Sequence, residues 1–410
     1  MHRLGRQSAF SLLAGLLAAL LFASSVPSPL YVVFQSEWHF SSITLTAVFA
    51  VYAIALLVAL LVVGSISDHI GRRPTLYAGL VVEVVAMIAF ANANSVEWLF
   101  AARILQGLAT GTAMGALSAA LLDLQPPDKP WLGGLMGAVA PMAGLALGAL
   151  AAGLLVDYGP DPTRFIFWLL VGVFALAVVA VRAVPETVEA DGQWRSSLRP
   201  RIAVPRGMRG PFLAALPTLT ASWALGGLIL ALGGSLTATV LGATSHVAAG
   251  LPIVVLAGTS ALVSIRLRDT PAQTTARWGL PALIVGVALA LVALRAGSDA
   301  LFLAGSAVAG LGFGPAFAGV FRTLTEMAPP DQRAALVSSV LTVSYLAFSL
   351  PAVIAGVAVT QFGLRDTAEV YGLSLIVVAA IALALSGSLG RTAAESEVLS
   401  NPAGARSSPR

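Results

Sequence analysis

The sequence has no cysteine and very few charged residues. Of its 410 residues, 10% are Asp, Glu, Lys or Arg, and 58% are hydrophobic. A soluble globular protein is about 25% charged, so this chain has too little polar surface to face water on every side. The lack of cysteine excludes disulfides and thiolate metal sites. The composition is therefore that of a membrane protein.

The sequence also lacks the motifs of soluble enzymes. It contains no Gly-rich loop ending in Gly-Lys-Ser/Thr, which would cradle nucleotide phosphates. Four histidines are scattered along the chain without the spacing of metal ligands: His2, His39, His69 and His246. We therefore expect no enzymatic activity, no metal and no cofactor.

Long apolar runs alternate with short polar segments along the whole chain. Each run is long enough to cross a membrane, which takes about 20 residues, and backbone groups in lipid must be paired within their own helix. The first run is too long for a cleaved signal peptide, so we expect it to be retained. Twelve helices are predicted near 8–34, 41–63, 74–92, 95–122, 131–156, 163–184, 211–241, 244–265, 276–296, 298–326, 333–360 and 366–388.

Basic residues predict the orientation. Most Lys and Arg residues fall on one side of the predicted helices, including Arg3, Arg6, Arg72, Arg73, Lys129, Arg182, Arg206, Arg209, Arg266, Arg268, Arg322 and Arg333. The opposite loops hold little beyond Arg164, Arg295 and Arg365. The positive-inside rule places both termini in the cytoplasm. The net charge of +4 is then a topology signal, and we expect no nucleic-acid partner.

An internal repeat divides the chain into two halves. Three groups of residues recur at one and the same offset: Gly107, Leu108 and Gly111 as Gly310, Leu311 and Gly314; Asp123–Asp128 as Glu326–Asp331; and Gly153 as Gly356. Transporters of this kind place a substrate site between their repeats. We predict an all-α membrane protein with a six-helix half at 1–184, a cytoplasmic linker at 185–210, a second six-helix half at 211–390 and a disordered cytoplasmic tail at 391–410.

The loop after the second predicted helix reads GSISDHIGRR at 64–73. It resembles the hallmark loop of the major facilitator superfamily, Gly-x-x-x-Asp-Arg-x-Gly-Arg-Arg/Lys, with His69 in place of an arginine. The resemblance implies a transporter fold over essentially the whole chain. It also implies a gating loop whose charges latch one state: Gly64, Asp68, Gly71, Arg72 and Arg73. The alternative is that the arginines only anchor the loop on the cytoplasmic side.

Three acids at cytoplasmic helix ends are candidates for the same charge cluster. Asp123 and Glu326 end the fourth and tenth predicted helices, at equivalent places in the repeat. Glu186 belongs to a Pro-Glu-Thr segment after the sixth helix, which resembles a further facilitator signature. Each can instead be an ordinary solvated helix end.

Two predicted helices carry candidates for proton coupling. The segment RILQG at 103–107 resembles the facilitator motif Arg-x-x-Gln-Gly, which implies a coupling role for Arg103 and Gln106. Arg103 lies roughly 12 Å inside its span, where a charge is costly and functional unless it snorkels to the surface. Glu83 is the carboxylate deepest in a span and can carry a proton. Against this, the third helix is usually peripheral in the family, and the first helix here has no acid.

The fifth predicted helix contains GAVAPMAG at 137–144. It resembles the antiporter signature Gly-x-x-x-Gly-Pro-x-x-Gly-Gly at Gly137, Pro141 and Gly144. Ala140 and Leu145 depart from the signature. The small residues can equally serve helix packing alone.

The resemblance places the substrate cavity between the first, fourth, seventh and tenth helices, flanked by the second, fifth, eighth and eleventh. Candidate lining residues are polar or aromatic side chains at suitable depth: Ser24, Ser28, Tyr31, Tyr52, Thr110, Met114, Trp223, Phe313, Phe317, Thr342 and Tyr345. Such a cavity is mainly apolar and favours an uncharged or lipophilic, cation-like solute over a polyanion.

We therefore expect a secondary transporter of the inner membrane that exports small, largely apolar solutes by rocker-switch alternation, coupled to protons. Its expected partners are the solute, protons and membrane lipids, and its expected state is a monomer. One alternative is a proton-independent or symport carrier for a sugar or metabolite. Another is a facilitator-fold protein that acts as a receptor or assembly factor without transport.

Overall fold

The computed structural model describes residues 3–190, 202–329 and 332–400, with the side chains of 388–400 left out. Within them the fold is all-α, as predicted, and eleven spans are long and apolar enough to cross a membrane. The spans are α1 with α2 (Arg6–Ser25 and Pro27–Trp38), α3 (Ser42–Val63), α5 (Arg72–Ala91), α6 (Val96–Leu124), α7 (Leu132–Tyr158), α10 (Arg209–Ser235), α11 (His246–Arg266), α12 (Ala272–Ala296), α13 (Asp299–Met327), α14 (Arg333–Phe362) and α15 (Leu364–Ser400). The shorter apolar helix α8 (Phe165–Val181) makes the twelfth.

Short helical elements join some of these spans. The loop after α3 forms α4 (Ser67–Ile70), and a 3-10 turn at Arg206–Met208 leads into α10. A π-helical segment at Leu236–Val240 ends the α10 span. Of these elements, α4 carries Ser67 and Asp68 of the gating loop.

The first span is broken at Val26, where α1 ends and α2 begins. Pro27 starts α2 and has no N–H, so it cannot donate to the carbonyl oxygen of Ala23 one turn earlier. The break therefore leaves a backbone acceptor free inside the membrane, where a side chain from another helix can bind it.

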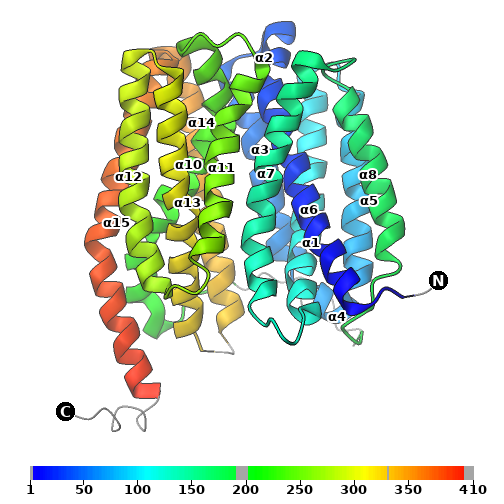
Figure 1. The fold of residues 1–410 in the computed structure, drawn as a ribbon, viewed down its shortest axis with the longest axis vertical. Helices are drawn as coiled ribbons and strands as arrows, with labels where there is room; N and C mark the ends of the chain where they lie inside the picture. Colours follow the sequence, from blue (N-terminus) through cyan, green and yellow to red (C-terminus); the bar gives the residue numbers. More distant parts are fainter. Residues whose placement is uncertain (1–2, 191–201, 330–331, 401–410) are drawn as a thin grey trace.

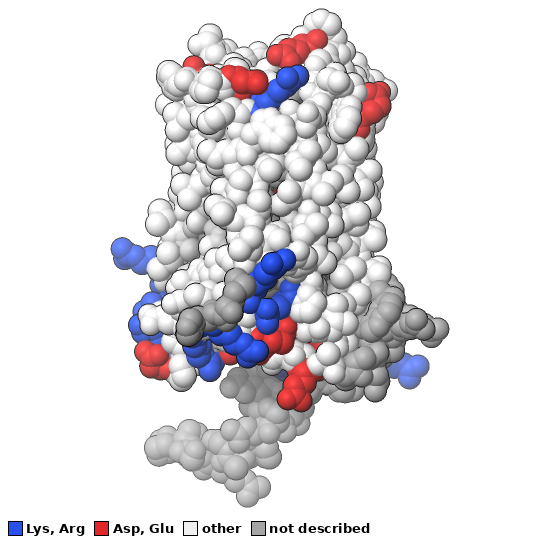
Figure 2. Space-filling model, turned by 90° about the vertical axis from the view of Figure 1, so that its right-hand side faces the viewer, with Lys and Arg blue, Asp and Glu red and all other residues white. Residues whose placement is uncertain are grey.

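The helices form two bundles that lie side by side, α1–α8 and α10–α15 (Figure 1). The start of α1 and the end of α15 lie at the same end of the molecule (Figure 1), as the prediction of two cytoplasmic termini requires. Figure 2 shows charged side chains at the two ends, with the blue basic residues mostly at that same lower end and an uncharged band between. This band has the character expected of a lipid-facing surface.

The repeated glycines make equivalent contacts in the two bundles. A Cβ on Gly107 would press on the Tyr52 carbonyl oxygen of α3, at 2.5 Å. A Cβ on Gly310 would press on Leu256 of α11 in the same way. The repeat therefore aligns α6 with α13 and α3 with α11, which confirms the prediction of two similar halves.

The other repeated glycines, Gly153 and Gly356, lie at the contacts between the two halves. Gly153 of α7 packs against Val247 of α11, and Gly356 of α14 packs against Thr46 of α3. We name these contacts the α7–α11 seam and the α3–α14 seam. Both lie near the extracytoplasmic ends of their helices, because α7 and α14 end there and α3 and α11 begin there. The molecule is therefore closed on its extracytoplasmic side.

The predicted linker and tail are described only in part. Residues 191–201 of the linker lie outside the described residues. The helix α15 runs to Ser400 and so covers the first ten positions of the predicted disordered tail, whose sequence from Thr392 is rich in helix-favouring Ala and Glu. Residues 401–410 lie outside the described residues.

Candidate functional site

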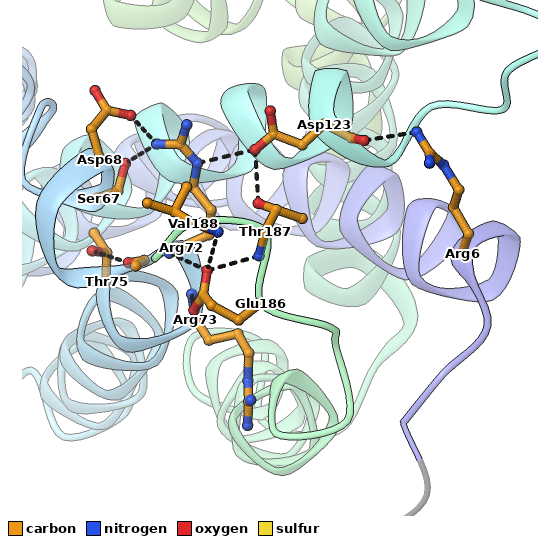
Figure 3. Close-up of polar contacts among 11 residues, drawn as sticks. Arg6, Ser67, Asp68, Arg72, Arg73, Thr75, Asp123, Glu186, Thr187 and Val188 are labelled. Atoms are coloured by element: carbon orange, nitrogen blue, oxygen red, sulfur yellow. Dashed lines mark hydrogen bonds and ion pairs between the residues drawn. The ribbon is translucent and has the colours of Figure 1, made fainter. Parts of the chain in front are cut away.

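The gating loop meets α6 and the start of the linker at the cytoplasmic end (Figure 3). The Arg72 guanidinium donates to the Ser67 hydroxyl at 2.7 Å and to the Asp123 carboxylate at 3.3 Å, and it pairs with Asp68. Thr187 donates to the same Asp123 oxygen at 2.8 Å. We call these residues, together with Glu186, the cytoplasmic charge cluster.

Glu186 binds the start of α5 through the backbone. Its two carboxylate oxygens accept from the N–H groups of Arg72 at 2.8 Å and Arg73 at 3.0 Å. The first N–H groups of a helix have no partner within the helix, and its dipole favours a negative charge there. Gly71 has a φ of +102°, and a Cβ on it would lie 2.7 Å from a Glu186 oxygen. Position 71 therefore requires a glycine for two reasons: the backbone there has a positive φ, and Glu186 approaches too closely to leave room for a Cβ.

Of the other predicted residues of this region, Glu326 lies apart from the cluster, while Arg73 and Gly64 belong to the gating loop itself. Glu326 lies in the other half, where it pairs with Arg322 at 3.8 Å on the surface. The backbone N–H of Arg73 binds Glu186, as described above, whereas its side chain donates to the Arg182 carbonyl oxygen at 2.8 Å. Gly64 follows α3 directly and begins the loop.

One further member of this region carries no signal in the sequence. Arg6, at the start of α1, donates to the carbonyl oxygen of Asp123 at 2.9 Å (Figure 3). It also donates to the carbonyl oxygen of Gln125 at 3.1 Å. These oxygens lie at the end of α6, in its last turn and at its C-cap residue, where carbonyl groups have no partner within the helix. A backbone acceptor is not visible in a side-chain pattern, so the sequence indicates Arg6 only as a topology signal.

The second group of predicted residues forms a buried network around Arg103. The side chains of Arg103 and Gln106 are fully buried. Arg103 donates to the Tyr31 hydroxyl at 2.7 Å, to Gln106 Oε1 at 2.7 Å and to the Ser24 carbonyl oxygen at 3.0 Å. Gln106 donates to the Ala23 carbonyl oxygen at 3.0 Å. The Ala23 oxygen freed by the break, together with the neighbouring Ser24 oxygen, thus holds the α6 pair, and Arg103 does not snorkel to the surface.

Aromatic rings complete the shell of Arg103. Its guanidinium carbon lies 5.4 Å from the Tyr31 ring centre, 5.1 Å from Tyr52 and 5.7 Å from Phe90. A cation over an aromatic face is stabilised by the ring quadrupole, more strongly where water is excluded. The site is therefore built to keep a positive charge inside the membrane.

Glu83 lies beside this network on α5 and is fully buried. It is close enough to Arg103 and Gln106 to interact with them electrostatically, yet neither of its oxygens has a hydrogen-bond partner among the described residues. Arg103 Nη2 and the hydroxyls of Thr110 and Ser28 are likewise buried and unpaired there. Buried polar groups are normally satisfied, so this cluster has spare capacity for a proton or for internal water.

Four of the predicted aromatic residues, Trp223, Phe313, Phe317 and Tyr345, gather in the second half. The Trp223 ring of α10 lies 5.4 Å from Phe317 of α13 and 4.8 Å from Tyr345 of α14. Phe313 of α13 packs beside Gly226 of α10. We call these rings, together with Phe348, the aromatic cluster. The remaining predicted lining residues, Met114 of α6 and Thr342 of α14, are half-buried.

Phe348 connects the aromatic cluster to the first half and was not among the predicted residues. It lies 5.7 Å from Trp223 and 4.8 Å from Phe49 of α3. Its signal in the sequence was its position three residues after Tyr345, on the same face of one helix. The α3–α14 seam therefore runs from Gly356 to an aromatic contact at mid-membrane depth.

The predicted glycines of the fifth helix play unequal parts. A Cβ on Gly144 would overlap the Ala18 carbonyl oxygen of α1, whereas one on Gly137 would meet nothing. Pro141 is buried within α7. Gly148, which the prediction omitted, meets Phe22 of α1 in the same way as Gly144. The motif thus brings α7 and α1 into close contact through Gly144 and Gly148.

The sequence of this chain is similar to those of known membrane transporters. The family model of the major facilitator superfamily matches residues 12–351. Over 132 residues the chain is 34% identical to the multidrug transporter MdfA of Yersinia pestis, and this covers 32% of each chain. Over 148 residues it is 32% identical to a chloramphenicol resistance protein of Pseudomonas aeruginosa, covering 34% of each. These matches span about a third of each relative's length.

Solved structures share the fold over nearly the whole chain. A point mutant of the nucleoside transporter NupG superimposes with a TM-score of 0.68 at 13% identity, covering 94% of this chain and 99% of that one. A bacterial homologue of the human lysosomal transporter Spinster, in an inward-facing and unoccupied conformation, superimposes with a TM-score of 0.73 at 12% identity, covering 94% and 98%. At sequence identities of 13% and 12%, this structural similarity shows a shared fold and nothing more. With its family model, its twelve spans and its repeated halves, the chain belongs to the major facilitator superfamily.

Proposed function

We propose that this transporter exports small, largely apolar solutes, including lipophilic cations, in exchange for protons. The observation that carries the proposal is the fully buried Glu83, whose oxygens have no partner among the described residues beside Arg103 and Gln106. A carboxylate in this position can take up a proton from one side and release it to the other. When it is charged, Arg103 compensates it, and when it is neutral, Arg103 keeps its other partners.

The aromatic cluster supports the choice of solute. Trp223, Phe317 and Tyr345 offer ring faces to an apolar or cationic molecule. A polyanion would require several basic side chains, and Arg103 is already bound on most sides. The partial similarity to MdfA and to the chloramphenicol resistance protein favours the same solute class. We further propose an inner-membrane location, contact with lipid around the bundle and a monomeric state.

Glu83→Gln is expected to abolish proton exchange while leaving the protein folded, because glutamine keeps the shape of the side chain but cannot titrate. Everted membrane vesicles with a pH-sensitive dye measure this directly. Tetraphenylphosphonium or chloramphenicol should discharge the proton gradient with the unchanged protein and not with Glu83→Gln. Glu37→Gln, at an exposed acid near the end of α2, is the matched control and should behave like the unchanged protein.

Other results would redirect the proposal. Normal discharge with Glu83→Gln would remove Glu83 from the coupling step. Discharge by sugars alone would indicate a metabolite carrier, and solute movement without any gradient would indicate a uniporter. A protein that moves no solute but co-purifies with a partner would indicate a receptor or assembly factor.

Asp68→Asn is expected to slow transport several-fold with little change in stability. The Asp68 side chain is 57% exposed, and exposed ion pairs contribute only about 0–1 kcal/mol. The substitution should therefore change the rate at which the transporter switches between its inward-open and outward-open states, and not the stability of the fold. Initial transport rates and thermal unfolding of purified protein measure the two effects separately. Asp128→Asn, at an exposed acid outside the cluster, is the control, and an unchanged rate in Asp68→Asn would remove the gating loop from the mechanism.

A further inference from the structure

A carboxylate of the first half binds the start of a helix in the second half. Asp157, in the last turn of α7, accepts from the N–H groups of His246 and Val247, both at 3.0 Å. It also accepts from the Ser245 hydroxyl at 2.6 Å and lies 2.8 Å from Nδ1 of His246. All four contacts cross the α7–α11 seam on the extracytoplasmic side.

These contacts replace the usual cap of α11. The first N–H groups of a helix need acceptors from outside the helix, which are commonly supplied by a Ser, Thr, Asp or Asn at the N-cap. Ser245 is the N-cap residue of α11, but its side chain makes no cap hydrogen bond to its own helix. The hydroxyl is turned toward Asp157 instead. The capping of α11 therefore depends on α7 of the opposite half.

The other seam is built differently, although the repeat relates the two. The helix α3, equivalent to α11, is capped by its own Ser41, which accepts from the Thr44 N–H at 3.2 Å. Thr360 lies four residues after Gly356, as Asp157 lies four after Gly153. It is uncharged, and its hydroxyl donates to Val357 within its own helix. The start of α3 is therefore capped by its own Ser41 and not by Thr360 of α14.

We propose that Asp157 is an extracytoplasmic latch that holds the two halves together by capping α11 across the α7–α11 seam. Opening this seam leaves the Asp157 carboxylate and the first N–H groups of α11 to find other partners. At the cytoplasmic end of the same two helices, the Arg268 guanidinium lies 4.4 Å from the Trp131 ring. Both of those side chains are substantially exposed, and an exposed cation–π contact is weak. The latch thus favours the state that is closed outside, whatever solute is carried.

The absence of cysteine allows a direct test by spin labelling of the full chain. Labels on Pro162→Cys and Ala300→Cys, exposed positions of the two halves on the extracytoplasmic side, report the width of that side by double electron–electron resonance. Without solute, Asp157→Ala is expected to raise the ratio of open to closed molecules about tenfold, as for the loss of a charge-assisted cap. Asp157→Asn retains one acceptor and should give a smaller shift. It also serves if the alanine variant does not fold.

A third variant separates the latch from ordinary helix capping. In Asp157→Ala/Ser245→Asp, the new carboxylate caps α11 from within its own half. We expect thermal stability to recover while the extracytoplasmic distances stay open. Asp161→Asn, at an exposed acid on the same side of the first half, controls for the loss of charge alone and should keep the closed distribution.

Three outcomes would overturn the proposal. Unchanged distances in both Asp157→Ala and Asp157→Asn would show that the contact does not hold the seam. Closed distances in the double variant would show that Asp157 acts only as a cap. An equal shift in Asp161→Asn would assign the effect to charge on that side rather than to this contact.

Discussion

Arg103→Ala is expected to abolish transport and to lower the free energy of unfolding by about 3–5 kcal/mol, because it leaves several buried polar groups without a partner, each at a cost of about 1–3 kcal/mol. The substitution leaves Glu83 without its compensating charge. It also removes the hydrogen bonds to Tyr31, Gln106 and the Ser24 carbonyl oxygen. Thermal unfolding in detergent and solute-driven proton movement in everted vesicles measure the two effects.

A double variant tests whether Glu83 is the source of the instability. If the uncompensated carboxylate dominates, Arg103→Ala/Glu83→Gln should be more stable than Arg103→Ala by at least about 1 kcal/mol, since contacting residues couple by about 0.5–3 kcal/mol. Equal stability of the two variants would show that the lost hydrogen bonds alone account for the damage. Arg103→Lys is the matched control for charge: it keeps the cation but not the planar fork, and should be intermediate.

Gly144→Leu is expected to lower the free energy of unfolding by about 2–3 kcal/mol, the cost of overpacking a tight contact. The added side chain would overlap the Ala18 carbonyl oxygen and force α7 away from α1. Gly137→Leu is the matched control, since it makes the same chemical change in the same helix where nothing lies within 4 Å. Thermal unfolding and the monodisperse fraction on size-exclusion chromatography measure both. Equal damage from the two would point to helix propensity instead of packing.

Much of the fold could be predicted because it follows from composition and period. Apolar runs determine the number of spans, and basic residues determine their direction. The repeated glycines coincide with two kinds of contact: Gly107 and Gly310 within the halves, Gly153 and Gly356 between them. The position of Asp123 at a cytoplasmic helix end made it a candidate partner for the gating loop, and its side chain contacts that of Arg72. Glu326 shows the limit of that reasoning, since equivalence in a repeat places a residue in the other half rather than in the same cluster.

The remaining contacts could not be predicted because they depend on how each helix is rotated about its axis. A nearly uniformly apolar helix has no polar stripe that determines this rotation. Two contacts depend on this rotation: Phe348 packs against Phe49, and Asp157 binds the start of α11. Backbone acceptors are equally hard to foresee, because the carbonyl oxygens of Ala23 and Ser24 carry no side-chain signature.

The break at Pro27 has a consequence for how this site tolerates mutation. The acceptor for Gln106 is the Ala23 carbonyl oxygen, which every amino acid possesses. Its availability depends on Pro27, because any other residue there would bring an N–H able to occupy it. A saturation scan should therefore tolerate small replacements at Ala23 and reject most at Pro27. The residue that keeps this polar site intact is therefore a proline, whose own side chain has no polar atom and takes no part in the hydrogen bonds of the site.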